Sequence, residues 1–173
     1  NGSYVSVVTH AGGGASLWKG RCVTRLREDR TRDHGSQLIY LRDVRSGAVW
    51  SATYQPVCRE PETYSVAFHL EKAVFHRRDD EIDTHLEIAV SPEDDVEVRR
   101  LSLANHGDRV REIEVTSYVE LVLGGLLEDF AHPAFGKLFV ETEWLPEGAA
   151  LLARRRPRGE GEAPFHAFHA LSL

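Results

Sequence analysis

The amino-acid sequence predicts an all-β fold, an antiparallel β-sandwich, in a single domain that covers residues 1–173. Short apolar runs with a period of two residues recur at regular spacing, and turn-forming residues separate them. No segment longer than about eight residues has a convincing helical period. A chain of 173 residues is long enough for one domain with a real hydrophobic core, and short for two.

The clearest predicted strand lies in the middle of the chain. Apolar and polar residues alternate over Ile82–Val90, and residues 91–95 (Ser-Pro-Glu-Asp-Asp) predict a turn after it. In the strand that follows, the apolar phase slips by one residue between Val98 and Leu101. This slip predicts a β-bulge near residues 99–100.

The return strand should follow a tight reversal at residues 105–108 (Asn-His-Gly-Asp). Apolar residues mostly occupy one parity over residues 110–123, so we expect an antiparallel meander with one solvent-exposed face. A hairpin turn is expected at residues 45–47, and a long loop over residues 124–135. The remaining strands are expected at residues 4–9, 22–25, 37–43, 48–52, 64–70, 73–78, 137–143, 149–155 and 165–173.

Composition excludes some classes of function. The chain is 42% apolar and 28% charged, as in ordinary globular proteins, and its net charge of −6 disfavours a general role in nucleic-acid binding. Cys22 and Cys58 have no metal-ligand spacing, so two free thiols are favoured over a disulfide. No membrane-spanning run and no signal peptide is visible. The chain begins without Met inside one strand-like run and stops inside another, which we interpret as a piece of a longer protein.

Motifs for catalysis are weak. The glycine-rich run at residues 10–15 lacks the Lys-Ser/Thr of a phosphate loop, and a turn or a close backbone contact is the better interpretation. The histidines form no metal motif, and the carboxylate pair Glu28–Asp29 lies beside arginines as a surface ion-pair patch would. No Ser-His-Asp elbow is present. We therefore expect no metal, no cofactor and no catalysis by this chain alone.

Aromatic residues offer the other candidate chemistry. A Trp in a β-sandwich is most often part of the core, and this applies to Trp18, Trp50 and Trp144. Along one extended strand, however, Trp50 and Tyr54 would share a face, with Gln55 at the strand end. That arrangement would suit a rim that binds a sugar or docks on another domain.

A family resemblance covers essentially the whole chain, and the run over residues 24–56 is its most specific part. The chain resembles the amino-terminal β-supersandwich domain of glycoside hydrolase family 94, once called glycosyltransferase family 36. Within that family the likeness is strongest to the portion found in cyclic β-1,2-glucan synthases. The residues that carry it include Asn1-Gly-Ser-Tyr4, Thr9–Gly14, Trp18, Thr24-Arg25, Arg27–Asp29, Asp33, Gly35, Tyr40–Asp43, Ser46-Gly47, Val49–Ser51, Gln55-Pro56, Val90–Asp94, Val98–Leu101, Glu112–Tyr118, His132–Phe135 and Lys137–Val140.

The resemblance implies a galactose-mutarotase-like sandwich joined to a helical (α/α)6 barrel that holds the catalytic Asp and the phosphate site. It implies as partners the barrel of the same parent chain, a second copy in a homodimer, and a β-glucan or oligosaccharide, with no nucleic acid. It also implies a bacterial inner-membrane parent with this domain in the cytoplasm. The residues expected to face the carbohydrate or the barrel are Trp18, Arg25, Arg27, Glu28, Asp29, Asp33, Trp50, Tyr54 and Gln55.

Three hypotheses remain open at this point. The chain is a structural and dimerisation domain of a β-glucan-processing enzyme, a sugar-binding module, or an enzyme in its own right such as a sugar epimerase. The last would need a pocket in which a His and a carboxylate reach one sugar. An open sheet edge over residues 165–173 would also need cover, and self-association could supply it.

Overall fold

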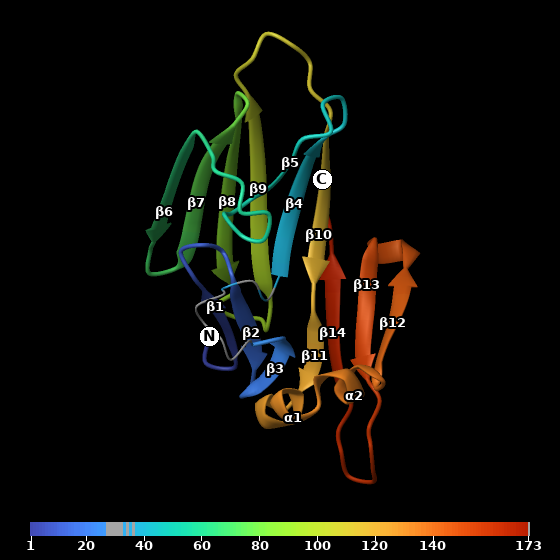
Figure 1. Cartoon of the computed structure of the whole chain (residues 1–173). Coiled ribbons are helices and arrows are strands. Elements are labelled where there is room, and N and C mark those ends of the chain that lie inside the picture. Colours follow the sequence, from blue (N-terminus) through green and yellow to red (C-terminus); the bar gives the residue numbers. More distant parts are fainter. Residues whose placement is uncertain (27–32, 34, 36, 173) are drawn as a thin grey trace.

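The computed structural model describes residues 1–26, 33, 35 and 37–172, and the expected antiparallel β-sandwich is confirmed. The described residues form four antiparallel sheets, with strand orders β1-β2-β3-β11, β10-β4-β5, β6-β7-β8-β9 and β12-β13-β14 (Figure 1). The strands are β1 (Tyr4–Val8), β2 (Gly14–Trp18), β3 (Arg21–Thr24), β4 (Gln37–Asp43), β5 (Val49–Ser51), β6 (Thr63–Phe68), β7 (Lys72–Asp79), β8 (Ile82–Val90), β9 (Glu97–Asn105), β10 (Ile113–Val119), β11 (Leu121–Gly124), β12 (Val140–Leu145), β13 (Ala150–Arg155) and β14 (Phe165–Ala170).

The larger of two hydrophobic cores lies between the β10-β4-β5 sheet and the β6–β9 sheet. Leu41 and Trp50 come from the first sheet, and Phe75 and Leu86 from the second. Alternate residues of β8 are buried, as the period of two predicted. Burying these side chains removes apolar surface from water and holds the two layers together.

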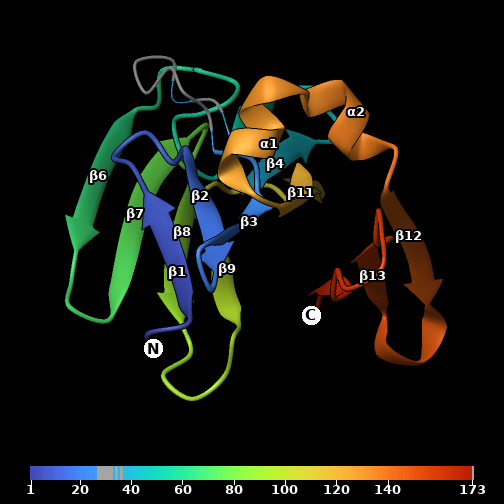
Figure 2. The same ribbon diagram turned by 90° about the horizontal axis from the view of Figure 1, so that it is seen from below.

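The smaller core joins the remaining two sheets. Val23 on β3 and Leu123 on β11 pack with Ala153 on β13 and Phe165 on β14. Seen from below, β12 and β13 stand to one side of the other sheets (Figure 2). This core is small, so the β12–β14 sheet leaves large apolar side chains exposed, including Trp144 and Phe168.

The expected loop over residues 124–135 is wrong, because two short helices occupy most of it. α1 spans Leu126–Ala131 and α2 spans Pro133–Lys137. Helices of six and five residues are too short to show a repeating apolar face, which explains why the sequence pattern missed them. Pro133 at the start of α2 is a favourable first helical residue.

The pairing expected for the middle of the chain is partly wrong. The register of β8 with β9 runs unbroken from Val90↔Glu97 to Ile82↔Asn105, so there is no bulge at residues 99–100. The predicted strand over 110–123 divides into β10, which pairs with β4, and β11, which pairs with β3. One apolar run therefore serves two sheets, and β10 does not continue a meander from β9.

The glycine-rich run ends in β2, a strand that the sequence analysis missed. The interpretation as a close backbone contact is confirmed. A Cβ atom on Gly12 would lie 2.1 Å from Thr53 Oγ1, and one on Gly14 would lie 1.8 Å from the carbonyl oxygen of Val7. Gly12 has φ +93°, a conformation that other residues rarely adopt.

Candidate functional site

The residues predicted to face a carbohydrate or a barrel do not form one site. Arg25 lines a pocket beside the helices, and Tyr54 lines a second pocket beside β6. Trp18 lies in neither, and Trp50 is in the larger core. Arg27, Glu28 and Asp29 lie outside the described residues.

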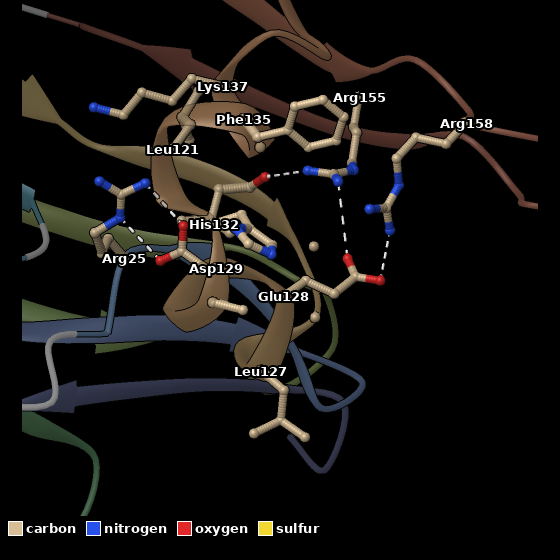
Figure 3. A pocket seen from close by; sticks show the side chains of 15 residues that line it. Arg25, Leu121, Leu127, Glu128, Asp129, His132, Phe135, Lys137, Arg155 and Arg158 are labelled. Carbon is tan, nitrogen blue, oxygen red and sulfur yellow. Dashed lines mark hydrogen bonds and ion pairs between the residues drawn. The ribbon is translucent and has the colours of Figure 1, made fainter.

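The Arg25 pocket is a cavity of about 350 Å³ that β11, α1 and α2 border, with two arginines from the segment around β13 (Figure 3). Its lining residues are Arg25, Leu121, Val122, Gly124, Gly125, Leu127, Glu128, Asp129, Ala131, His132, Phe135, Gly136, Lys137, Arg155 and Arg158. Apolar side chains and paired charges thus share one cavity.

Arg25 is held by two carboxylates. Its Nε and Nη2 donate to Asp129 at 2.9 and 2.8 Å, and its Nη1 donates to Glu120 at 2.6 Å. Burial alone would lower the pKa of Arg25, but the hydrogen bond to Asp129 and the charge of Glu120 outweigh burial and raise that pKa. Lys137 approaches Glu120 at 3.1 Å. The guanidinium therefore ties β3 to α1 and to the β10–β11 junction.

The other charges of the pocket are paired in the same way. Arg158 Nη2 lies 2.5 Å from Glu128, and Arg155 Nη2 lies 3.8 Å from it (Figure 3). The hydrogen bond from Arg158 lowers the pKa of Glu128. Arg155 is 4% exposed and also donates to the carbonyl oxygen of Val122 at 3.3 Å.

The pairing of these carboxylates with arginines affects whether they could act as general acids. A general acid that works near neutral pH needs a raised pKa, which comes from burial or from a neighbouring like charge. The pKa is lowered at the carboxyl groups of Asp43, Glu87, Asp95 and Glu128. Arginines and hydrogen-bond donors keep these groups ionised.

The Tyr54 pocket is a second cavity, of about 390 Å³, that His10, Ala11, Tyr54, Glu60, Pro61, Glu62, Thr63 and Tyr64 line. The Tyr64 ring meets the His10 ring at 5.5 Å and 81° and the Tyr54 ring at 6.5 Å and 60°. The Tyr54 hydroxyl lies 3.0 Å from Glu60 Oε1, and the hydrogen bond to that carboxylate raises the pKa of Tyr54. The pocket thus combines aromatic walls with carboxylates at its edge.

A buried arginine, Arg77, holds the loop over residues 53–59, which carries Tyr54. Arg77 on β7 forms a two-pronged ion pair with Asp79 at 2.6 and 2.8 Å. It also donates to the carbonyl oxygens of Thr53 at 2.5 Å and Arg59 at 3.2 Å, which are the two ends of the loop. Gln55 donates its backbone N–H to the carbonyl oxygen of Ala11 at 2.8 Å. The loop is therefore anchored at both ends and in its middle.

Asp33 and Gln55, two further predicted residues, lie near this pocket without lining it. Asp33 accepts a hydrogen bond from Thr9, and a Cβ atom on Gly13 would lie 2.2 Å from Asp33 Oδ1. Gln55 precedes Pro56 in a cis peptide bond. Asp33 thus lies against the glycine-rich run, and Gln55 links that run to the Tyr54 loop through its backbone N–H.

Trp50 was expected to face the carbohydrate or the barrel, and the structure contradicts this expectation. Its side chain is 0% exposed and packs against the larger core. The strand that carries it, β5, ends at Ser51, so the extended run that would have given Trp50 and Tyr54 one face does not exist. Trp18 is half-buried, with its ring 5.2 Å from that of Phe165 and its Nε1 donating to Asp95 at 2.5 Å.

The sequence analysis missed most of the partners at both pockets. Asp129 and Glu128 lie in the helix that was expected to be a loop, and Arg155 and Arg158 lie far along the chain. Tyr64 was assigned only to a strand. An acid on a short helix such as α1 carries no local signal of its arginine partner.

Among the described residues, no group of three or more His, Cys, Asp or Glu is arranged to hold a metal ion. Cys22 is buried and Cys58 exposed, and both are free thiols. None of the helices in the described ranges is long and apolar enough to cross a membrane.

In the part of the chain that the structure describes, antiparallel sheets pack around two hydrophobic cores, which is the architecture of a β-supersandwich domain. The chain belongs to the family described as "Glycosyl hydrolase 94, supersandwich domain", which matches residues 1–172. The family resemblance predicted from the sequence is thereby confirmed.

Several characterised enzymes are similar to this chain. The chain is 36% identical over 172 residues to cyclic beta-(1,2)-glucan synthase NdvB of Rhizobium meliloti (strain 1021), covering 99% of this chain and 6% of that protein. It is 28% identical to solabiose phosphorylase of Paenibacillus borealis, covering 100% of this chain and 23% of that enzyme. It is 28% identical to N,N'-diacetylchitobiose phosphorylase of Vibrio proteolyticus, covering 73% of this chain and 16% of that enzyme. The chain thus spans less than a quarter of the length of each.

Proposed function

We propose that this chain is a non-catalytic structural domain of a larger β-glucan-processing enzyme, in which it docks on a helical barrel of the same parent. The observation that carries the proposal is the pairing of the carboxylates at the Arg25 pocket. Asp129 accepts two hydrogen bonds from Arg25, and Glu128 is paired with Arg158. Carboxylates held in this way organise the helices rather than donate protons.

The surface beside the Arg25 pocket supports a docking role. Leu127, Phe135 and Leu138, which we call the docking face, are 80%, 53% and 67% exposed. Phe135 also packs edge to face on Phe139 at 5.3 Å. Leu127 and Phe135 also line the Arg25 pocket, and exposed apolar side chains of this kind are typical of an interface with another domain.

The comparisons support the class of parent enzyme. The similar proteins are named as a cyclic beta-(1,2)-glucan synthase, a solabiose phosphorylase and an N,N'-diacetylchitobiose phosphorylase. Most of the length of each lies outside the region that this chain matches. Cyclic β-1,2-glucan synthesis is the parent activity that we propose, with the barrel supplying the catalytic groups.

Two measurements test the proposal. The chain is mixed with the helical barrel domain of its parent, and complex formation is followed by size-exclusion chromatography with light scattering. We expect a complex, and we expect Leu127→Asp with Leu138→Asp to abolish it, while Val110→Asp, at an exposed residue outside the docking face, leaves it intact. If the wild-type chain forms no complex with the barrel domain, the docking role is contradicted.

The second measurement addresses catalysis. The chain alone is incubated with β-1,2-glucan and phosphate, and released sugars are measured with and without the barrel. We expect no turnover from the chain alone. The same sample, followed by NMR of glucose anomer exchange, tests the epimerase alternative, since His10 and two carboxylates line the Tyr54 pocket. Turnover of glycan or accelerated anomer exchange by the chain alone would contradict a non-catalytic role.

A further inference from the structure

We propose that the Tyr54 pocket binds one pyranose ring of a neutral β-linked gluco-oligosaccharide. This site is separate from the Arg25 pocket, with which it shares no lining residue. The choice of ligand class rests on the proposed function, because that function places the domain in a glycan-processing enzyme. The geometry of the pocket carries the rest.

The size and lining of the pocket suit a sugar. A cavity of about 390 Å³ lies in the lower part of the range, roughly 300–1,000 Å³, that small-molecule sites occupy. Tyr54, Tyr64, Ala11 and Pro61 supply apolar surface, whereas the remaining lining residues are polar. A pyranose has an apolar C–H face and a ring of hydroxyls at its edge, and this division matches the division of the lining.

The aromatic rings are held at an angle to one another. Tyr64 meets both His10 and Tyr54 edge to face, and neither contact is a flat stack. Tyr64 is fixed further by its own hydroxyl, which donates to the carbonyl oxygen of His10 at 2.8 Å and accepts from the backbone N–H of Tyr54 at 3.3 Å. The half-buried Tyr54 ring is therefore placed as a wall on which a sugar face can lie.

Two exposed carboxylates stand at the edge of the pocket. Glu60 accepts a hydrogen bond from Tyr54 through Oε1, which leaves Oε2 to accept from a sugar hydroxyl. Glu62 accepts from the backbone N–H of Asp80 at 3.0 Å and lies 3.6 Å from Arg78. Arg78 offsets the charge of Glu62, and the tetramethylammonium arm of the test below distinguishes a neutral polyhydroxy ligand from a cation.

The pocket is preformed. Arg77 anchors Thr53 and Arg59 at the ends of the Tyr54 loop, and Gly12 allows Thr53 to approach the glycine-rich run. Side chains that are already positioned lose little entropy when a ligand binds, so a small ligand can bind measurably. We place Arg77 as a positioning residue for this site, acting through the loop.

The test is a titration of the full chain with sophorose, the β-1,2-linked glucose disaccharide, followed by two-dimensional amide NMR. We expect dissociation in the millimolar range with shifted amides around residues 10–11 and 54–64. Tyr54→Ala should weaken binding at least about tenfold. Tyr54→Phe, which keeps the ring and loses the hydroxyl bonded to Glu60, should weaken it less.

Trp144→Ala is the matched control. It removes an exposed aromatic side chain from β12, outside the pocket, and should leave sophorose binding unchanged. Amide dispersion shows whether each variant is folded, and Glu60→Gln provides a second variant that keeps the aromatic walls. The proposal is overturned if the folded wild-type chain does not bind sophorose at tens of millimolar, if Trp144→Ala weakens binding as much as Tyr54→Ala, or if tetramethylammonium binds in its place.

These outcomes are independent of the docking role. Binding is measured without the barrel and without turnover, so absence of sophorose binding overturns the sugar site alone. Loss of the complex with the barrel, or catalysis by the chain alone, overturns the proposed function alone.

Discussion

Arg25 and Asp129 are 104 residues apart in the sequence, and they form two parallel hydrogen bonds of 2.9 and 2.8 Å in the interior of the protein. Both residues are buried. The pair joins the end of β3 to α1, and thereby holds in place the helices that border the Arg25 pocket (Figure 3).

Breaking this pair should destabilise the fold strongly. Arg25→Ala would leave Asp129 as a buried carboxylate without its main partner, at a cost of about 3–5 kcal/mol. The measurement is urea unfolding followed by circular dichroism. The double variant Arg25→Met with Asp129→Leu should lose less than the sum of the two single changes, since it leaves no unpaired charge.

An exposed ion pair provides the control for this prediction. Arg42 and Glu114 lie 3.2 Å apart on neighbouring strands, with both side chains about half exposed. Arg42→Ala should change the unfolding free energy by less than about 1 kcal/mol. If Arg25→Ala and Arg42→Ala lower the free energy of unfolding equally, the buried pair does not stabilise the fold more than the exposed pair does.

Replacement of Trp50 should act on stability rather than on a surface. Because the side chain is 0% exposed and in contact with the larger core, Trp50→Ala should cost about 3–5 kcal/mol through lost burial and a cavity. Trp144, at 55% exposure, should tolerate the same change with a much smaller loss. Thermal unfolding of the two variants side by side checks the difference, and a stable Trp50→Ala protein would contradict the placement of this residue.

Gly12→Ala should disturb the contact between the glycine-rich run and the Tyr54 loop. The new Cβ atom would overlap Thr53, and φ +93° is unfavourable for Ala, so we expect a loss of at least about 1 kcal/mol. Gly159→Ala, where no heavy atom lies within 4 Å of the new Cβ and φ is not in the left-handed range, is the control. Urea midpoints measure both, and similar midpoints would argue against a close contact at Gly12.

Acid sensitivity should depend on Asp43. The backbone N–H of Ser46 and the side chain of Arg111 donate to Asp43 and lower its pKa to about 2. The pKa in the unfolded chain is about 3.9, so the stabilisation from Asp43 is complete above pH 4 or so and is lost as the pH falls toward the folded-state pKa.

Asp43→Asn should therefore flatten the fall of the urea midpoint between about pH 4 and pH 2. Asn keeps an acceptor for the N–H of Ser46 but cannot pair with Arg111. Asp108→Asn, at an exposed side chain, is the control and should leave the acid limb unchanged. If the urea midpoint falls equally with pH in wild type and Asp43→Asn, other groups govern acid unfolding.

Local patterns in the sequence located most strands well. Gln37–Asp43 and Ile82–Val90 were predicted with the bounds that the structure has, because alternation of apolar and polar residues is a property of the strand itself. The two helices were missed because neither is long enough to show a periodic face. The bulge was predicted from a phase slip, yet β9 keeps its register and lets apolar residues such as Val98 and Leu103 face solvent.

The candidate sites were less predictable. Tyr54 does line a pocket, but it lies in a loop and its partner Tyr64 comes from β6, whereas Trp50, four residues away, is part of the core. Whether an aromatic residue faces solvent depends on which layer packs over it, and that information is spread over the whole chain.

The all-β class, the position of most strands and the membership in the supersandwich family were predictable from the sequence, because strand periodicity, turn chemistry and family motifs lie within short segments. The pairing of β10 with β4, the contact of Arg25 with Asp129, and the pocket that Tyr54 and Tyr64 share became visible in the three-dimensional structure. Such contacts join residues far apart in the chain. They form only when packing of the layers brings those residues together, and short segments carry no record of their distant partners.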